Sequence, residues 1–418
     1  AMTSSESQRS HRSIRAALRA VTPYRIRRLL LNIVRPREFA EKPVTHLSFD
    51  PQLDYDVVCY PIIDWNYLFQ RPQQLATKFA ATNHRVFYFH TTFHQSGASA
   101  FARQPADRIN IVRLPGSRKV EALYQNQMSE PAIERCLEAI ATLRSHALMD
   151  KAVSLVQFPA WAQVALRARE RWGWKVVYDC MDEHSGFSQS PAFLDEFEGR
   201  LLRQSDLVTA SSHALYEKAS KLSTRVIALP NAADFEHFSR GDSNPLADIP
   251  RPVIGYYGAI SDWLDVDMIR DAAIARPKWQ FVFVGDSFGV DLSHLERLSN
   301  VHFTGRKPYA ELPAYLHRFD VAVIPFRLTP LTLATNPVKF YEYLSAGKPV
   351  VAVDLPELQP YREYFYPVHA PADFVPRLED ALAESSAERV QARIEFARRN
   401  DWSERYEVLN SAIRGLTR

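Results

Sequence analysis

Short apolar runs alternate with longer amphipathic stretches along most of the chain after residue 54. A brief apolar run between turn residues is typical of a buried strand, whereas a longer segment with a 3.6-residue apolar repeat is typical of a helix. In the first half of the chain this pattern predicts strands at 56–61, 85–89, 109–112, 153–156, 175–178, 207–210 and 225–229. It predicts helices at 71–81, 130–148, 160–172 and 193–204.

The same alternation restarts after the polar run 240–252. The predicted strands there are 253–257, 281–284, 301–303, 321–324 and 350–353, and the predicted helices begin near 265 and span 309–317, 337–346, 374–384, 387–399 and 401–416. Alternating strands and helices favour parallel sheets that are covered on both faces. We therefore expect an α/β fold whose two halves join near residue 235 and present the carboxyl ends of their strands to a cleft.

One stretch, NPVKFYEYLSAGKPVV, begins at Asn336 and combines several features of a phosphate site. Thr335 or Asn336 is suited to cap a helix, and Pro337 is suited to its first position. Such a helix start offers unpaired backbone N–H groups and a positive dipole end, which suit a phosphate. Lys339 adds a positive charge, and Glu342 lies about 7.5 Å beyond Pro337 along the axis. A nucleotide spans a similar distance from diphosphate to ribose, so Glu342 is a candidate for the sugar hydroxyls.

Composition narrows the classes of function. A chain of 418 residues is long enough for two domains, and a net charge of +3 is too small to indicate a nucleic-acid partner. The three cysteines, Cys59, Cys136 and Cys180, lie far apart, which predicts reduced thiols, a cytoplasmic setting and no structural zinc. No apolar run in the sequence approaches the ~20 residues that a membrane span requires.

Residues 9–37 carry nine arginines and no acidic residue, with apolar residues at helical spacing between them. Two short amphipathic helices broken at Pro23 would bind an anionic membrane surface. A docking arm against the protein, a disordered tail and a mitochondrial address fit the same composition. The expected parts of the chain are a basic segment at 1–50, domains at 51–235 and 236–400, and a last helix at 401–418.

Several short motifs follow one another in a defined order. They are YDCMDE at 178–183, ASS at 210–212, LPNAAD at 229–234, and the stretches 300–309, 320–326 and 336–351. Their order and spacing resemble the GT-B glycosyltransferases of glycosyltransferase family 4, over most of residues 55–416. The resemblance implies two Rossmann-like domains, with a nucleotide diphosphate sugar bound to the second half and the acceptor to the first. It also implies a retaining transfer without a metal or other cofactor, and a final helix that crosses back to the first half.

On the donor side, the resemblance assigns Glu342 to the ribose and Lys339 to the diphosphate. The other donor-side residues that it implies are Asn336 and Pro337 at the helix start, Gly255 and Gly258 in the first loop of the second half, Arg306 at the nucleobase edge, and Arg327. Two features depart from the family's pattern. Ala334 stands where an acid is usual, and no Arg–Lys pair follows the strand 253–257, so the diphosphate charge falls to Lys339, helix starts and Arg327 or Arg306.

On the acceptor side, Asp182, Glu183 and His184 follow a predicted strand of the first half and should face the cleft. Asp182 or His184 could act as the base of an inverting reaction, but Asp182 could equally cap a helix and His184 could be structural. Trp65 could stack on a sugar or pack in the interface. Arg71 could hold an acceptor phosphate or carboxylate, or be a surface residue at a helix start.

The combined expectation is a hexosyl- or deoxyhexosyltransferase of cell-surface polysaccharide synthesis. It would act on a glycan or lipid-linked acceptor, in the cytoplasm or at the inner face of the membrane. A nucleotide-sugar epimerase of the same architecture and a non-catalytic nucleotide-sugar-binding scaffold are alternatives. Asp265 and Asp267 spell a DxD pattern that is used by metal sites, but acids are common at a helix start for dipole reasons, and we expect no metal.

Overall fold

The structure is a computed structural model that describes residues 42–43, 54–94, 100–116, 123–187 and 190–417. The chain divides into residues 1–41 and residues 42–418, and the described residues all belong to the second unit. The predicted basic helices and membrane contact of residues 9–37 therefore lie outside the described residues.

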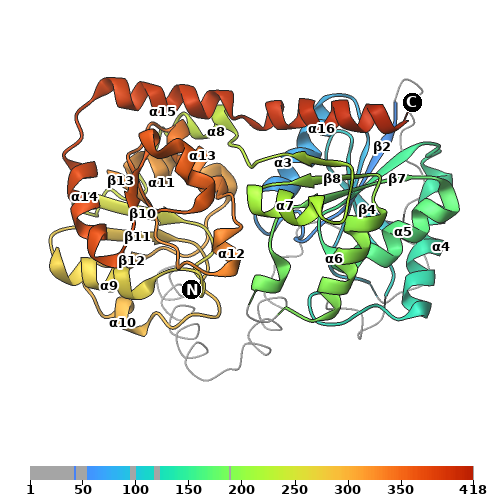
Figure 1. Ribbon diagram of the computed structural model, residues 1–418, viewed down its shortest axis with the longest axis horizontal. Coiled ribbons are helices and arrows are strands. Elements are labelled where there is room, and N and C mark those ends of the chain that lie inside the picture. The colour runs from blue at the N-terminus through green and yellow to red at the C-terminus, as the bar shows by residue number, and fades with distance from the viewer. Residues whose placement is uncertain (1–41, 44–53, 95–99, 117–122, 188–189, 418) are drawn as a thin grey trace, which may run out of the picture. The chain divides into compact units, whose positions relative to one another are not determined.

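The first half contains, within the described residues, a sheet of nine strands in the order β1-β4-β5-β3-β2-β6-β7-β8-β9 (Figure 1). The strands are β1 (Lys42–Pro43), β2 (Asp56–Tyr60), β3 (Val86–Phe89), β4 (Phe101–Ala106), β5 (Ile109–Arg113), β6 (Ala152–Val156), β7 (Lys175–Cys180), β8 (Leu207–Ala210) and β9 (Val226–Ala228). The α-helices are α3 (Arg71–Ala81), α4 (Glu130–His146), α5 (Ala162–Trp172), α6 (Phe193–Gln204) and α7 (His213–Ser220), with short 3-10 turns at Pro159–Trp161 and His184–Gly186. The neighbouring strands β5, β3, β2, β6, β7, β8 and β9 are parallel to one another. Strand β4 pairs antiparallel with both β5 and β1.

The second half contains a parallel sheet in the order β12-β11-β10-β13-β14-β15. Its strands are β10 (Val253–Tyr257), β11 (Gln280–Val284), β12 (Val301–Phe303), β13 (Val321–Ile324), β14 (Val350–Val353) and β15 (Tyr366–Val368). Its helices are α8 (Phe235–Phe238), α9 (Val266–Ala275), α10 (Ser293–Glu296), α11 (Leu312–Arg318), α12 (Pro330–Leu333), α13 (Val338–Ser345), α14 (Phe374–Leu382) and α15 (Ala387–Arg399), with 3-10 turns at Tyr309–Glu311, Pro356–Tyr364 and Pro371–Asp373. The predicted α/β class with two mainly parallel sheets is confirmed.

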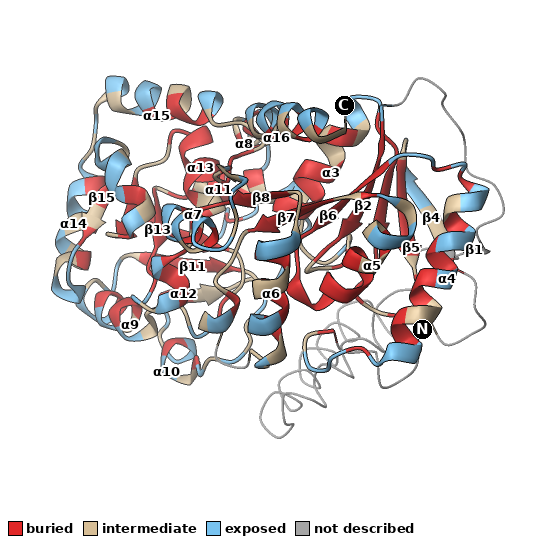
Figure 2. Ribbon diagram, turned by 45° about the vertical axis from the view of Figure 1, so that its right-hand side comes forward, coloured by how far each residue is buried: buried red, intermediate tan, exposed pale blue. Residues whose placement is uncertain are grey.

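The strands are apolar on both faces because helices cover both faces of each sheet. Every residue of β2, β6, β10 and β11 is buried, as expected for parallel strands in such layers. Figure 2 shows burial concentrated in the strands and on the helix faces turned towards them. The strand order reverses beside β2 in one sheet and beside β10 in the other, and open sheets bind ligands at such switch points.

Two segments that connect the halves run next to each other. The backbone of Ala233 accepts a hydrogen bond from Trp402 and donates one to Asn400, and Asp401 accepts from the N–H of Phe235. After this crossing the last helix, α16 (Trp402–Thr417), lies against the first half. Its buried residues Trp402, Tyr406, Leu409 and Ile413 join the apolar cluster of α3 and β2.

Several elements differ from the sequence prediction. The strands β1, β4 and β15 were not predicted, and neither were the helices α7, α8, α10 and α12. The sequence of β4, FARQPA, is interrupted by Arg103, Gln104 and Pro105, and the proline is tolerated because this strand lies near the edge of its sheet. Helices of four residues, such as α12, are too short to show a 3.6-residue repeat. Among the described residues, no helix has the length and apolar character needed to cross a membrane.

Candidate functional site

The carboxyl end of β10 and the start of α13 form the centre of the site in the second half. Gly258 directly follows β10 with a φ of +128°, and an added Cβ there would lie 3.1 Å from Cε of Lys339. Glycine at this position therefore allows both the backbone conformation and the close approach of the lysine. Gly255 has a different role from the predicted one. It lies inside β10, where an added Cβ would collide with the Phe319 ring, so it packs the core instead of lining the ligand loop.

The start of α13 differs from the prediction by one residue. Pro337 is the N-cap and the helix begins at Val338, whereas the sequence suggested Pro337 as the first helical residue. Among the described residues, no side chain caps this helix. The N–H groups of its first turn and the positive end of its dipole therefore remain available for an anion.

Lys339 and Glu342 lie close together near this helix start. The Lys339 ammonium lies 5.3 Å from the centre of the Tyr256 ring and 5.5 Å from that of Phe326. The side chain of Glu342 is 7% exposed, and its Oε2 accepts a 2.8 Å hydrogen bond from the Tyr257 hydroxyl. The Tyr256 and Phe326 rings attract the ammonium by cation–π interaction, which does not use its N–H donors.

Burial shifts the pKa values of both groups towards neutrality. Burial raises the pKa of Glu342 to about 7, although the Tyr257 hydrogen bond and the Lys339 charge act in the opposite direction. Burial lowers the pKa of Lys339 to about 8, although the Glu342 charge opposes this. Shifts of this kind, caused by burial of charged groups near one another, are common at functional sites.

The two candidate arginines of the donor side are partly exposed. Arg306 donates to the Tyr67 carbonyl oxygen at 3.2 Å, lies over the Tyr67 ring and approaches Asp286 at 3.6 Å. Arg327 approaches Asp267 at 3.6 Å. Asp265 caps α9 by accepting from the N–H of Met268, as expected for an acid at a helix start. Among the described residues, no group of three or more His, Cys, Asp or Glu side chains is arranged to hold a metal.

The loop after β7 carries the acceptor-side candidates Asp182, Glu183 and His184. Burial raises the pKa of Asp182 to about 7, with Arg71 opposing the shift and Asp179 adding to it. Burial, helped by the charge of Lys218, lowers the pKa of His184 to about 4, so the buried imidazole is neutral at pH 7. Its ring lies beside the Phe158 ring, and its Nε2 has no hydrogen-bond partner among the described residues.

Glu183 borders an open cavity of about 660 Å³. Its Oε1 accepts hydrogen bonds of 2.8 Å from Lys218 and 2.7 Å from Ser185. Lys218 also donates to the buried Glu198 at 2.8 Å, so the ammonium is fixed between two carboxylates. The other lining residues are Asp195, Gly199, Leu202, Arg203, Ala214 and Leu222 from the first half, and Pro330, Leu333 and Ala334 from the second.

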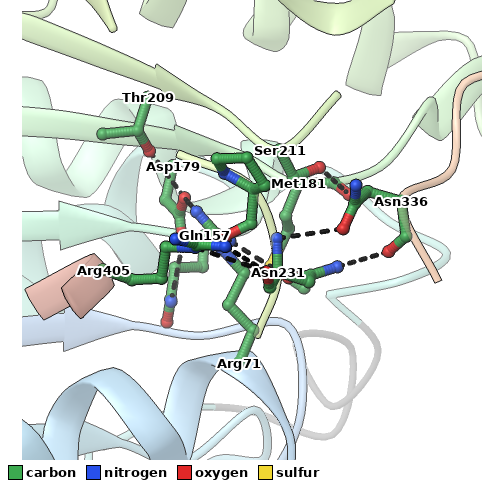
Figure 3. Close-up of polar contacts among 10 residues, drawn as sticks. Arg71, Gln157, Asp179, Met181, Thr209, Ser211, Asn231, Asn336 and Arg405 are labelled. Atoms are coloured by element: carbon green, nitrogen blue, oxygen red, sulfur yellow. Dashed lines mark hydrogen bonds and ion pairs between the residues drawn. The ribbon is translucent and has the colours of Figure 1, made fainter. Parts of the chain in front are cut away.

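The remaining acceptor-side candidates are placed differently from the expectation. Arg71 is 2% exposed and forms a buried ion pair with Asp179 at 2.7 Å (Figure 3). Its guanidinium therefore faces protein groups and is not presented to an acceptor. Trp65 is half-buried and makes edge-to-face contacts with Phe69 and Tyr88, which agrees with packing in the interface.

Asp179 is the buried centre of a polar network at the carboxyl end of β7. Its carboxylate accepts hydrogen bonds from Arg71, from the Thr209 hydroxyl at 2.6 Å and from Gln157 Nε2 at 3.0 Å. Burial alone would raise the pKa of Asp179, but the Arg71 charge and these hydrogen bonds lower it. Sequence reasoning missed this residue. The acid inside the apolar strand KVVYDC is the signal that could have indicated a buried cationic partner.

Asn336 is also engaged differently from the prediction. Its side-chain oxygen accepts from the N–H of Asn231 at 3.0 Å, and its backbone oxygen accepts from Asn231 Nδ2 at 2.6 Å. Its Nδ2 donates to Glu357 and to the Tyr341 hydroxyl. Asn336 therefore joins α13 to the first half and does not cap the helix.

Comparisons with known proteins show what the second half is similar to. Residues 251–384 match the family model described as "Glycosyl transferases group 1". A curated protein of Bacillus subtilis (strain 168), described as "Putative teichuronic acid biosynthesis glycosyltransferase TuaH", is 32% identical over 254 residues. That alignment covers 55% of this chain and 64% of the relative, so it spans slightly less than two thirds of that protein.

Solved structures share the architecture over most of the chain. Sucrose-phosphate synthase from Thermosynechococcus elongatus has a TM-score of 0.67 at 14% identity, over 86% of this chain and 99% of its own. The Anabaena protein HepE in complex with UDP and glucose has a TM-score of 0.59 at 15% identity, over 86% of this chain and 99% of its own. These similarities show that the chain has the GT-B fold.

The buried placement of Arg71 leads to a prediction about stability. Replacing Arg71 by Met leaves the Asp179 carboxylate buried without its cation, which should lower the free energy of unfolding by about 3–5 kcal/mol. The matched control is Arg171→Met, because Arg171 pairs with Glu134 at the surface and should contribute at most about 1 kcal/mol. Urea denaturation of both variants measures the difference. Equal stabilities for the two variants would show that the pair is not the structural centre described above.

Proposed function

We propose that the protein transfers a sugar from a nucleoside diphosphate sugar to a glycan or lipid-linked acceptor, and the match of residues 251–384 to the model of group 1 glycosyl transferases supports this. The observation that carries the proposal is the uncapped start of α13 with Lys339 and Glu342 beside it. Together these groups offer N–H donors and a cation to phosphates, and a carboxylate to ribose hydroxyls.

The names of the similar proteins support a narrower proposal. HepE was solved with UDP, and another similar structure is described as "bound with UDP-2-fluoro glucose", so we propose uridine diphosphate (UDP) as the nucleotide carrier. The TuaH description supports a role in the synthesis of a cell-surface polysaccharide. Ala334 gives no information about which sugar is bound. It is buried against the apolar cluster of the first half and carries no carboxylate for the sugar hydroxyls.

The main chemical task of such a site is to stabilise the diphosphate as it leaves. The bond from the anomeric carbon to the phosphate oxygen breaks while a bond to the acceptor oxygen forms. In the retaining course that we propose, the acceptor hydroxyl attacks from the side of the leaving group and its proton passes to the diphosphate. Lys339 and the start of α13 stabilise the negative charge that develops on the leaving diphosphate, and their positions are fixed before the reaction.

The acceptor side of the proposal rests on the cavity beside Glu183. Its volume of about 660 Å³ lies within the range of small-molecule sites. Leu202, Leu222 and Leu333 offer apolar surface to a sugar ring or a lipid, and Glu183 with Lys218 offers polar partners. Asp182 and His184 flank Glu183 in the sequence, and we propose that they contact the acceptor hydroxyl. A pKa of about 7 would also suit Asp182 to an inverting reaction, in which it would remove the acceptor proton.

Product analysis separates the proposed transferase from its alternatives. The protein is incubated with UDP-sugars in the presence and absence of a polysaccharide or lipid-linked acceptor, and released UDP is measured. A transferase releases UDP mainly when the acceptor is present, and the anomeric configuration of the product distinguishes retention from inversion. An epimerase converts the nucleotide sugar without an acceptor. Tight binding without turnover of any nucleotide sugar would contradict the transferase and favour a scaffold.

The lysine at the helix start should carry much of the affinity for the diphosphate. Lys339→Met removes the cation, which should weaken UDP binding by about 1.5–3 kcal/mol, roughly ten- to a hundredfold. Lys278→Met is the matched control, because Lys278 is exposed and precedes β11, at the amino end of the parallel strands, whereas the site lies at their carboxyl end. Isothermal titration calorimetry measures both. An affinity that falls equally in the two variants, or in neither, is incompatible with a diphosphate at Lys339.

The shifted pKa values predict how UDP affinity depends on pH. The Glu342 carboxylate is ionised above about pH 7 and the Lys339 ammonium is charged below about pH 8, so affinity should be highest between these values. It should fall at lower pH as Glu342 takes up a proton, and at higher pH as Lys339 loses one. In Glu342→Gln the acid limb should move to the protonation of the phosphate itself, at about pH 6. Calorimetry across the neutral range checks this, and an unchanged acid limb in Glu342→Gln would remove Glu342 from the site.

A further inference from the structure

Asn231 and Asn336 form a reciprocal pair between the segment that leaves the first sheet and the start of α13. The Asn231 N–H donates to Asn336 Oδ1 at 3.0 Å, and Asn231 Nδ2 donates to the Asn336 carbonyl oxygen at 2.6 Å (Figure 3). The two side chains are 7% and 3% exposed. Asn336 directly precedes Pro337, the N-cap of α13, so this pair contacts the backbone that leads into the proposed phosphate site.

Asn231 is itself held from two sides. Its Oδ1 accepts a hydrogen bond from Arg71 Nη1 at 3.0 Å, and Arg71 is fixed by the buried carboxylate of Asp179. Arg405 of α16 donates to the carbonyl oxygens of Pro230 at 3.1 Å and Asn231 at 3.3 Å. The position of Asn231 is therefore determined by α3, β7 and α16 together (Figure 3).

A second contact holds Asn336 from its other side. Asn336 Nδ2 donates to Glu357 Oε2 at 3.2 Å, and Glu357 Oε1 accepts from the N–H of His213 at 2.6 Å. His213 is the first residue of α7 in the first half. Asn336 thus contacts the first half directly through Asn231 and indirectly through Glu357.

We propose that Asn231 is a positioning residue for the donor site, which it serves by fixing the start of α13 and with it Lys339 and Glu342. The proposal rests on the proposed function of that helix. An amide suits this role because it donates to the Asn336 carbonyl while it accepts from Arg71, and it does so without adding a further charge to the buried network. A carboxylate at residue 231 would keep the Arg71 contact. It would also place an oxygen against the Asn336 carbonyl oxygen, and two acceptors cannot form a hydrogen bond with each other.

Two substitutions separate the contacts of Asn231. Asn231→Ala removes the side-chain bonds to both Arg71 and Asn336. Asn231→Asp keeps an acceptor for Arg71, loses the side-chain donor to Asn336 and adds a negative charge. The matched control is Asn300→Ala. Asn300 is a buried asparagine of the second half that donates to the carbonyl oxygens of Ala273 and Trp279, but it precedes β12 at the opposite edge of the sheet.

Hydrogen exchange and UDP calorimetry are measured on the same variants of the full chain. We expect the amides of residues 338–345 to exchange roughly tenfold faster in Asn231→Ala and Asn231→Asp, and UDP to bind roughly tenfold more weakly. In Asn300→Ala both quantities should stay at the wild-type value, although this variant also loses stability. A role of Asn231 in general stability alone would move all three variants together.

The two readouts distinguish failure of the positioning role from failure of the proposed function. Unchanged exchange in residues 338–345 of both Asn231 variants would overturn the positioning role, whatever the UDP affinity. Faster exchange with unchanged UDP affinity would overturn it as well, because the helix start would then be free to move without effect on the ligand. Faster exchange in a protein that does not bind UDP even as the wild type would support the Asn231 contact and would contradict the proposed donor site.

Discussion

A carboxylate with no solvent exposure must be paired, and that of Asp179 determines the arrangement of its surroundings. The cation that pairs with it, Arg71, is equally removed from water and needs acceptors for its remaining N–H groups. These acceptors are Asn231 and the carbonyl of Pro230, in the segment that leads to the second half. Asn231 in turn needs partners for its own N–H groups and finds them at Asn336. The requirement to satisfy one buried charge thus extends from the first sheet to the helix of the proposed donor site.

This arrangement explains why the start of α13 is open. An asparagine before a proline is well suited to cap a helix, but Asn336 uses its side chain to contact Asn231, Glu357 and Tyr341. The helix therefore begins without a side-chain cap, which is unfavourable in the absence of a ligand. Lys339 and Glu342 are likewise buried with pKa values shifted towards neutrality. A local loss of stability of this kind is typical of functional sites, where the ligand supplies the partners of the buried and uncapped groups.

The sequence allowed the architecture to be predicted because apolar periodicity is a local signal. The helices at 71–81, 193–204 and 387–399 begin and end at the predicted residues, and most buried strands lie within one or two residues of the predicted bounds. Lys339 and Glu342 were candidates for a similar reason, since the features of a helix start lie within a few residues of one another. The strand β4 was missed because Arg103, Gln104 and Pro105 interrupt its apolar run.

Contacts between residues that are distant in the sequence could not be predicted from local patterns. Arg71 was a candidate for binding an acceptor phosphate or carboxylate, with an exposed residue at a helix start as the alternative, but its partner Asp179 lies 108 residues away. Asn336 looked like a cap, but Asn231 lies 105 residues away. Gly255 looked like part of a ligand loop, and only the packed sheet shows that the Phe319 ring occupies the space beside it. In each case the residue that the local pattern assigned to a ligand makes a tertiary contact instead.

The central claim is that the start of α13 holds the diphosphate of a nucleotide and Glu342 holds its ribose. A crystal structure of the protein with UDP tests this most directly. The account predicts phosphate oxygens within hydrogen-bond distance of the Lys339 ammonium and the first-turn N–H groups of α13, and ribose hydroxyls at the Glu342 carboxylate. UDP bound away from α13, or bound there with its ribose directed away from Glu342, would contradict it.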